Sequence, residues 1–293
     1  MKNQNQTWIN MLKGRIQNIN STKYVVDIND TYYDCTLRGI FRKQKITPLV
    51  GDYVEINEKD LQIVKIFPRN NYLTRPNIAN VDIALIITST KKPDLDLVLL
   101  DKLLTNVISR NIEAIICFTK TDLLDDLELN EFKKMKKYYE TIGIKCILNT
   151  ELDLFRKYVA NKVIVACGQT GAGKSTFINK IDPNLQLSTN PISESLNRGV
   201  HTTRYVSLYK IDNYYIADTP GFSALDLYDL SDEMIRDSFI EFANYDCKYR
   251  DCNHINTDGC SIINNKNILI SRYENYVKFI KEKNENSSKL FKK

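Results

Sequence analysis

Residues 168–175 constrain the fold of this chain more than any other feature. They read GQTGAGKS, follow the apolar run KVIVAC and precede STFINKI, which has helical spacing. Glycines at these positions let the backbone curl where a strand ends, so that its N–H groups surround an anion at the start of a helix. The segment therefore predicts an α/β domain in which a buried strand carries a phosphate-binding loop.

The side chains of this loop predict nucleotide binding with a metal ion. Lys174 should reach the β- and γ-phosphates and act in catalysis, and the Ser175 hydroxyl should bind Mg²⁺. The residues expected to contact the nucleotide here are Gly168, Gln169, Thr170, Gly171, Ala172, Gly173, Lys174, Ser175 and Thr176.

Strand and helix patterns alternate on both sides of this loop. Apolar runs at 81–88, 112–118, 144–148 and 162–168 are typical of buried parallel strands, and 95–110 and 127–142 have helical spacing. This order predicts a parallel sheet with helices on its faces.

Two polar segments after the loop suit the metal and the γ-phosphate. In DTPG at 218–221, Asp218 ends the strand NYYIAD and can lie on the Mg²⁺ side, while the N–H of Gly221 can contact the γ-phosphate. In NRGVHTTR at 197–204, either Thr202 or Thr203 can cover Mg²⁺, and we favour Thr203. His201 is the candidate for positioning the attacking water, although a surface histidine is an equally good interpretation.

A base-recognition segment precedes the loop in the chain. TKTD at 119–122 ends the strand IEAIICF, where Asp122 can accept two hydrogen bonds from guanine, which adenine cannot supply. The stem of Lys120 can lie along the base. Thr119, Lys120, Thr121 and Asp122 are therefore further candidate nucleotide contacts.

Residues 12–67 contain five short strand patterns separated by turn residues. They predict a small barrel, either an OB-fold that binds nucleic acid or an SH3-like or docking module. Residues 1–75 hold 12 Lys and Arg against 7 Asp and Glu, an excess equal to the whole chain's net charge of +5. In RGIFRKQK at 38–45, cations flank Phe41, which suits phosphate contact with base stacking or else a solvated loop.

The C-terminal region after about residue 225 has helical patterns and a Cys/His insert. Cys247, Cys252, His254 and Cys260 lie within fourteen residues, which suits a structural tetrahedral Zn²⁺ site. Such a site would help to fix a small domain that we expect to have little core of its own. Cys35, Cys117, Cys146 and Cys167 fall in apolar runs and are expected to be buried thiols.

Composition argues against export and membrane insertion. No apolar run approaches the ~20 residues that span a bilayer, and the N-terminus MKNQNQTWIN has no signal-peptide core. Seven cysteines, an odd number, make a disulfide framework unlikely. We therefore expect a cytoplasmic monomer with no membrane contact.

Together these motifs resemble one family, the circularly permuted ribosome small-subunit-dependent GTPase A. In most small GTPases the phosphate-binding loop precedes N-K-x-D, whereas here TKTD comes first and GVHTTR and DTPG follow the loop. The resemblance implies an OB-fold at 1–72, a permuted GTPase domain at 73–225 and a mainly helical zinc-binding domain at 226–293. It also implies GTP hydrolysis stimulated by the small ribosomal subunit during late maturation, with GTP or GDP, Mg²⁺ and rRNA as ligands.

Three positions depart from common GTPase patterns. Thr119 replaces the usual Asn, which should weaken a contact with the base and the phosphate-binding loop, and no base-closing S-A segment is evident near 149–150. Phe222 stands where many GTPases have a water-orienting Gln, which the resemblance makes expected and which points to His201. Two rivals remain: an ATPase with a zinc module, which competition between GTP and ATP would reveal, and an RNA-binding assembly factor whose binding ignores the nucleotide state.

Overall fold

The computed structural model describes residues 10–183, 206–218 and 227–290. The chain divides into two compact units. The first contains residues 1–81, 161–165 and 198–220, and the second contains residues 82–160, 166–197 and 221–293. Strand β11 (Val163–Gly168) contributes to both units, because the division falls between Val165 and Ala166.

Unit 1 begins with a closed five-stranded barrel. Strands β1, β2 and β3 pair antiparallel in sequence order, β3 pairs parallel with β5, and β4 closes the barrel by pairing with both β5 and β1. The strand bounds are Met11–Asn20, Lys23–Ile28, Thr31–Leu37, Tyr53–Asn57 and Gln62–Ile66. The short helix α1 (Gly39–Lys43) lies between β3 and β4. This arrangement confirms the predicted OB-fold.

Alternation of side chains explains why these strands close into a barrel. Ile16, Val26, Val54, Ile56 and Ile63 are buried and form its core with Cys35. Their neighbours along each strand point outward, because successive side chains of a strand face opposite sides. Burial raises the pKa of Cys35 to about 11, so the thiol behaves as a small apolar group.

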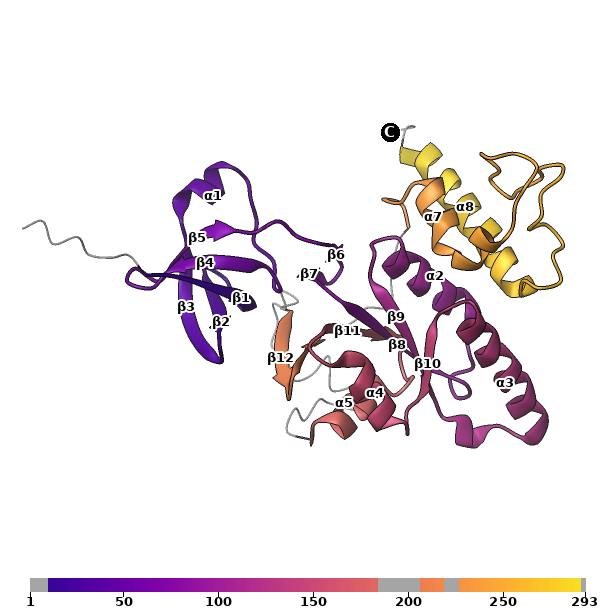
Figure 1. Cartoon of the computed structure of the whole chain (residues 1–293), viewed down its shortest axis with the longest axis horizontal. Helices are drawn as coiled ribbons and strands as arrows, with labels where there is room; N and C mark the ends of the chain where they lie inside the picture. The colour runs from indigo at the N-terminus through magenta and orange to yellow at the C-terminus, as the bar shows by residue number, and fades with distance from the viewer. Residues whose placement is uncertain (1–9, 184–205, 219–226, 291–293) are drawn as a thin grey trace, which may run out of the picture. The chain divides into compact units, whose positions relative to one another are not determined.

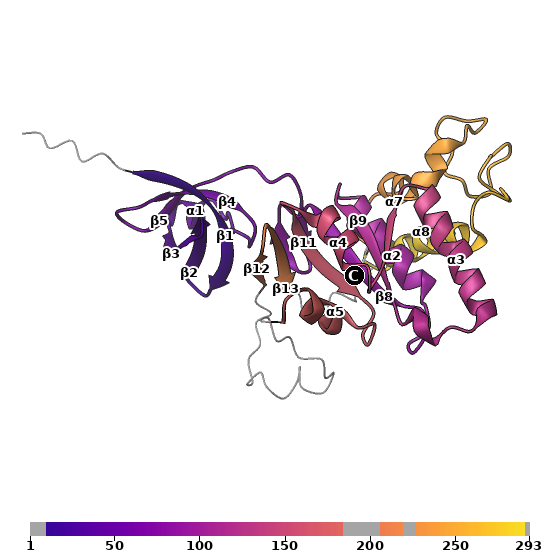
Figure 2. The same cartoon turned by 60° about the horizontal axis from the view of Figure 1, so that its bottom comes forward.

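Two hairpins complete the described part of unit 1. Strands β6 (Tyr72–Thr74) and β7 (Asn77–Ala79) form a short antiparallel pair. Strands β12 (Ser207–Ile211) and β13 (Tyr214–Asp218) pair antiparallel over five positions, and β13 also pairs in parallel with residues 163–165 of β11. Figure 2 shows β12 and β13 beside one another.

Unit 2 contains the parallel α/β layer that the sequence predicts. Strands β8, β9 and β10 pair in parallel, and all seven residues of β8 are buried. The bounds are Ile83–Ser89, Glu113–Thr119 and Lys145–Leu148 for the strands, and Leu97–Ile108, Asp126–Thr141, Leu152–Val159 and Lys174–Ile181 for α2 to α5. Helix α4 is the element of this layer that the sequence patterns did not predict.

The C-terminal part of unit 2 has a substantial core, so the expectation of little core is wrong. Helix α7 (Asp232–Ser238), the 3₁₀ helix η3 (Ile240–Asn244) and helix α8 (Ile270–Leu290) pack around a cluster of buried apolar residues. Its members are Leu227, Leu230, Ile235, Phe239, Phe242, Ile262, Ile268, Tyr276, Phe279 and Ile280. Aromatic side chains separated by up to 40 positions meet here, which the linear spacing did not reveal.

A buried ion cluster attaches α8 to α2 and η3. The fully buried guanidinium of Arg272 donates from Nε and Nη2 to the two carboxylate oxygens of Glu241, at 2.7 and 2.8 Å, and from Nη1 to Asp101 at 2.8 Å. Asp101 also accepts from Tyr139 (2.9 Å) and from Asn275 (2.7 Å). The pKa of Arg272 is raised by these carboxylates against the opposing effect of burial. Figure 1 shows α8 close to α2.

Among the described residues, no helix has the combination of length and apolar character that crossing a bilayer requires.

Candidate nucleotide and metal sites

The phosphate-binding loop depends on glycines for steric reasons. Gly168, Gly171 and Gly173 have φ values of +135°, +77° and +91°, a region that favours glycine. A Cβ on Gly168 would lie 1.9 Å from the carbonyl oxygen of Ile87 in β8. The loop can therefore leave β11 only with glycine at 168, which is the backbone condition the sequence motif predicted.

Lys174 begins helix α5 and its side chain lies over this loop. Its Nζ donates to the carbonyl oxygens of Gly168 (2.9 Å) and Gln169 (3.0 Å). The ammonium group is thus held at the edge of the curled backbone, at the start of an eight-residue helix, and the N-terminus of a helix favours an anion. Ser175 is half-buried in the first turn. This donor set fits a nucleotide's phosphates.

The base-recognition segment lies against the phosphate-binding loop. The Thr119 hydroxyl donates to the carbonyl oxygen of Ala172 at 2.7 Å, and Lys120 Nζ donates to that of Gly171 at 2.9 Å. A Cβ on Gly173 would be 4.0 Å from the Thr119 side chain. Residues 53 positions apart in the chain therefore meet where the parallel strands β9 and β11 end.

Thr119 contacts the phosphate-binding loop although it stands in place of the usual Asn. The replacement of Asn by Thr was expected to weaken the contact with the phosphate-binding loop, yet the buried hydroxyl keeps a short hydrogen bond to it. Asp122 lies in the 3₁₀ turn η1 (Thr121–Leu123) and is exposed. Its carboxylate is therefore accessible to a base, immediately after the two residues that touch the loop.

The sequence patterns missed a second segment beside TKTD. Thr90 donates from its backbone N–H and from its hydroxyl to the carbonyl oxygen of Thr119, both at 3.1 Å, and Lys120 Nζ also donates to the carbonyl oxygen of Lys92. Lys91 Nζ contacts both carboxylate oxygens of Glu128 at 2.7 and 2.6 Å. This pairing raises the pKa of Lys91 and lowers that of Glu128. Thr119 and Lys120 are thus held by hydrogen bonds to residues 90 and 92 as well as by those to the loop.

Several predicted site residues lie outside the described part of the chain. They are His201, Thr202, Thr203 and Gly221. The backbone of Asp218 is described as the last residue of β13, where the strand pattern placed it.

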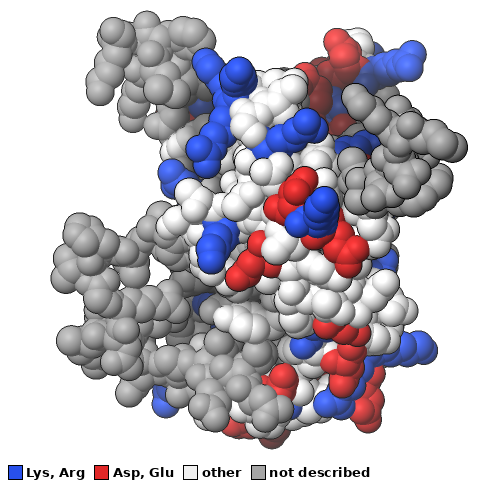
Figure 3. Space-filling model, turned by 90° about the vertical axis from the view of Figure 1, so that its left-hand side faces the viewer, with Lys and Arg blue, Asp and Glu red and all other residues white. Residues whose placement is uncertain are grey.

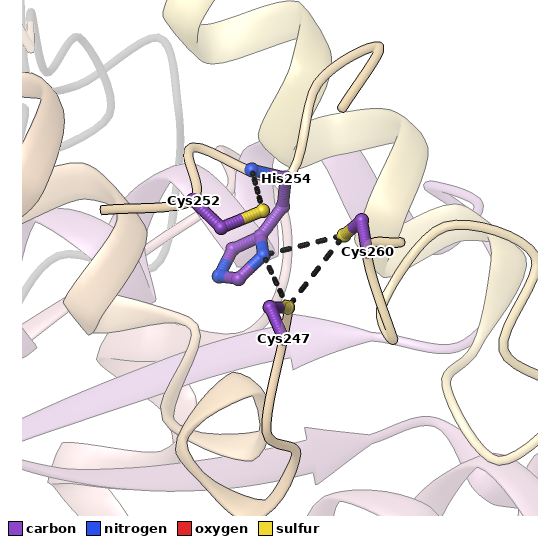
Figure 4. Close-up of side chains that lie close together, drawn as sticks. All are labelled: Cys247, Cys252, His254 and Cys260. Carbon is purple, nitrogen blue, oxygen red and sulfur yellow. Dashed lines mark hydrogen bonds between the residues drawn. The ribbon is translucent and has the colours of Figure 1, made fainter. Parts of the chain in front are cut away.

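The four predicted zinc ligands lie together (Figure 4). Their ligand atoms all lie within 4.8 Å of one another. Sγ of Cys247 is 3.8 Å from Sγ of Cys260, and each of these sulfurs is 3.5 Å from Nδ1 of His254. Tetrahedral Zn²⁺ with ordinary bond lengths separates two sulfurs by about 3.8 Å and sulfur from nitrogen by about 3.6 Å. The cluster, completed by Cys252, therefore fits Zn²⁺.

The surroundings of His254 favour a ligand role. Burial lowers the pKa of His254, which keeps the imidazole in the neutral form that binds metals. Its ring packs against Phe242 with centroids 5.2 Å apart, and its backbone carbonyl accepts from the Tyr273 hydroxyl at 3.0 Å. The backbone N–H groups of His254 and Ser261 point to the sulfurs of Cys252 and Cys247, each at 3.4 Å, a contact that stabilises a thiolate. All four ligands are already held by the fold.

On the barrel, the proposed stacking role of Phe41 is wrong. Phe41 lies in α1 and is buried, so its ring is not available to a base. Cations and rings do meet elsewhere on the barrel: Lys13 Nζ is 4.7 Å from the ring centroid of Phe67, and the Arg15 guanidinium is 4.4 Å from that of Tyr53. On the face in Figure 3, basic side chains are interspersed with acidic ones, so charge alone does not define an RNA surface.

A phosphate-binding loop that follows its base-recognition segment in the chain, with an OB barrel before it and a Cys₃His cluster after it, defines a circularly permuted P-loop nucleotide-hydrolysing protein. The RsgA GTPase family model matches residues 66–228, and the RsgA N-terminal domain model matches residues 13–63. The chain therefore belongs to the RsgA GTPase family and is a GTP-hydrolysing enzyme.

Relatives align over nearly the whole chain. A protein of Oceanobacillus iheyensis called small ribosomal subunit biogenesis GTPase RsgA 2 is 43% identical, covering 93% of this chain and 97% of its own. The RsgA of Enterococcus faecalis is 39% identical over 96% and 98%. Among solved structures, YjeQ from Thermotoga maritima is 29% identical with a TM-score of 0.80, covering 94% and 99%. YloQ, described as a circularly permuted GTPase, is 31% identical with a TM-score of 0.79, covering 98% and 99%.

Proposed function

We propose that this chain binds the small ribosomal subunit and its rRNA, acts in late maturation of that subunit, and hydrolyses GTP to GDP and phosphate with stimulation by the subunit. The names of its relatives support the ribosomal role. The observation that supports the site best is the contact of Thr119 and Lys120 with Ala172 and Gly171. Two residues of TKTD thus bond to the phosphate-binding loop, which supports a role for this segment in recognising the base.

In this proposal the loop and TKTD hold the nucleotide from two ends. Backbone N–H groups of residues 168–176 bind the phosphates, and Lys174 exchanges its loop carbonyls for the β- and γ-phosphate oxygens. Lys120 lies along the base with its stem, and Asp122 accepts from the guanine edge. Thr119 keeps the two segments in register.

Hydrolysis depends on residues that precede the β12–β13 hairpin in the sequence, end it or follow it. Ser175, Thr203 and Asp218 hold Mg²⁺, which neutralises charge that develops on the phosphates. Gly221 contacts the γ-phosphate through its N–H, and His201 orients the attacking water, because Phe222 cannot do so. Docking on the subunit brings His201 into place, so free turnover is slow.

The three expected domains divide this work. Residues 1–72 contact rRNA through the barrel, residues 73–225 hydrolyse GTP, and residues 226–293 form the zinc-binding domain that makes a second rRNA contact. Cys247, Cys252, His254 and Cys260 hold one structural Zn²⁺ that stabilises the loops between η3 and α8.

Phosphate release from GTP, with and without purified small ribosomal subunits, tests this function. We expect turnover to rise by about 100-fold or more with small subunits, the lower end of what one positioned acid–base group contributes, and to stay basal with large subunits, the matched control. His201→Ala should remove most of the stimulation and leave GTP affinity within about twofold. Equal turnover with either subunit would contradict the ribosomal part of the proposal.

A further inference from the structure

The OB barrel and the β12–β13 hairpin share a hydrogen-bonded sheet. The first half of β1 pairs with β4, and Asn18 in its second half stands opposite Ser207 of β12. Ser207 in turn stands opposite Asp218. Only one residue of β12 therefore separates a barrel strand from the strand end that carries Asp218.

Tyr215 of β13 joins the barrel by its side chain. Its hydroxyl donates to a carboxylate oxygen of Asp27 in β2 at 2.8 Å, and Asp27 is only 5% exposed. The Arg15 guanidinium lies near two rings, 4.4 Å from the centroid of Tyr53 and 5.2 Å from that of Tyr215. We call Arg15, Asp27 and Tyr215 the Tyr215 junction.

The junction is more specific than ordinary packing between side chains of neighbouring strands. A buried carboxylate is costly unless it is hydrogen-bonded, and Asp27 meets that cost with Tyr215 and with the backbone N–H of Asp30 at 2.9 Å. The pKa of Tyr215 is raised by burial and by this carboxylate, so its hydroxyl remains a donor. An ion pair between Lys210 of β12 and Asp30 adds a second polar contact at the same edge.

The position of Tyr215 on β13 makes the junction relevant to the reaction. Tyr215 precedes Asp218 by three positions, about 10 Å of extended strand. On its other side, β13 pairs in parallel with residues 163–165 of β11, so the strand cannot shift alone. A movement of the barrel relative to β11 therefore acts on the strand end at Asp218.

We propose that Tyr215 is a positioning residue: held by Asp27 and Arg15, it couples ligand binding on the OB barrel to the placement of Asp218. The inference rests on the proposed role of Asp218 at Mg²⁺. When RNA binds the barrel, the junction transmits the change to β13, and Asp218 at its end is better placed to bind Mg²⁺. Without the junction, barrel binding and hydrolysis become independent.

The first test uses the free protein and needs no ribosome. Tyr215→Phe removes the hydroxyl and keeps the ring, Asp27→Asn removes the charge, and Tyr209→Phe on the neighbouring strand is the matched control. For each protein we measure the Mg²⁺ concentration at which binding of a fluorescent GTP analogue is half-maximal. A coupling of ordinary size predicts an increase of about fivefold for Tyr215→Phe and Asp27→Asn, with unchanged values for Tyr209→Phe.

The second test titrates small ribosomal subunits against GTP turnover. We expect Tyr215→Phe to lower the maximal turnover about fivefold while the half-saturating subunit concentration stays within about twofold of wild type. A change in the half-saturating concentration alone would show that the junction only docks the barrel, and would overturn the inference.

The two arms separate this inference from the proposed function. If small subunits fail to stimulate GTP hydrolysis by the wild type, the proposed ribosomal function is wrong. The Mg²⁺ dependence of nucleotide binding then tests the positioning role of Tyr215 by itself. If the wild type is stimulated and Tyr215→Phe matches it in both measurements, the proposed function stands and the positioning role is overturned.

Discussion

The hydroxyl of Thr119 donates a 2.7 Å hydrogen bond to the carbonyl oxygen of Ala172, inside the phosphate-binding loop. Thr119 is 2% exposed, so water cannot replace this bond. Since the two residues are 53 positions apart in the sequence, the bond ties the base-recognition segment to the phosphate-binding loop.

Thr119→Val should therefore weaken nucleotide binding. The variant keeps the side-chain shape but leaves a buried carbonyl unpaired, which costs about 1–3 kcal/mol. We expect the affinity of Thr119→Val for GDP to fall by about tenfold, measured by titration with a fluorescent GDP analogue. Thr119→Asn retains a hydrogen-bond donor and should bind GDP more tightly than the Val variant. Thr141→Val on the exposed end of α3 is the control, and equal losses in both Val variants would argue against the contact.

Asp122→Asn tests base recognition separately. The carboxylate should accept two guanine hydrogen bonds, and hydrogen bonds to charged groups contribute about 1.5–3 kcal/mol each. We expect GTP affinity to fall at least tenfold, roughly 1.4 kcal/mol, with little change in weak ATP binding. Asp126→Asn in the first turn of α3 is the control. Competition binding with GTP and ATP measures both, and parallel losses of the two nucleotides would contradict guanine recognition by Asp122.

Gly168→Ala should prevent the loop from forming. Its Cβ would lie 1.9 Å from the Ile87 carbonyl oxygen at a φ of +135°, and strain and overpacking each cost about 1–3 kcal/mol. We expect a large fall in thermal stability and no measurable nucleotide binding. Gly39→Ala, where nothing lies within 4 Å of the added Cβ, is the matched control and should melt like the wild type. Calorimetry of both variants decides whether crowding is the cause.

Local patterns predicted the α/β layer and the phosphate-binding loop because both arise from neighbouring residues. The uninterrupted burial of β8 follows from its apolar run, and the loop geometry follows from its glycines. The meeting of Thr119 with Ala172 could be expected in outline, since parallel strands present their ends on one edge. The particular hydrogen bond could not, because it depends on how far β9 and β11 extend.

Contacts between distant segments were the part that the sequence did not reveal. Helix α4 is amphipathic but only eight residues long, so its pattern is too short to stand out in the sequence. Phe41 lies among cations in the sequence, yet a short helix turns its ring inward. The Arg272 cluster joins residues up to 171 positions apart, and no local pattern marks an arginine for burial. The role of the zinc domain's own core was missed for the same reason.

Removing one zinc ligand should unfold the loops around the metal. Cys252→Ser replaces a thiolate by a poor ligand in a cluster whose geometry fits Zn²⁺. We expect the purified wild type to contain about one zinc per chain, as a closed four-ligand site does, and the variant to contain far less and to melt several degrees lower. Cys146→Ala, a buried thiol outside the cluster, is the control. Atomic emission measures the zinc content of each protein. One zinc per chain in Cys252→Ser would show that Cys252 is not a zinc ligand.

The ion cluster of Arg272, Asp101 and Glu241 can be tested by comparing the stability of single and triple variants. Arg272→Met leaves Asp101 and Glu241 as buried carboxylates without their cation, which should cost about 3–5 kcal/mol. Replacing all three by apolar residues removes the unpaired charges, so the triple variant should be more stable than Arg272→Met alone. Arg236→Met breaks a partly exposed pair with Asp237 and should cost less than about 1 kcal/mol. Urea unfolding of the four proteins gives the comparison. A triple variant less stable than the single one would mean that hydrogen bonds from Tyr139 and Asn275, rather than charge balance, hold α8 against α2.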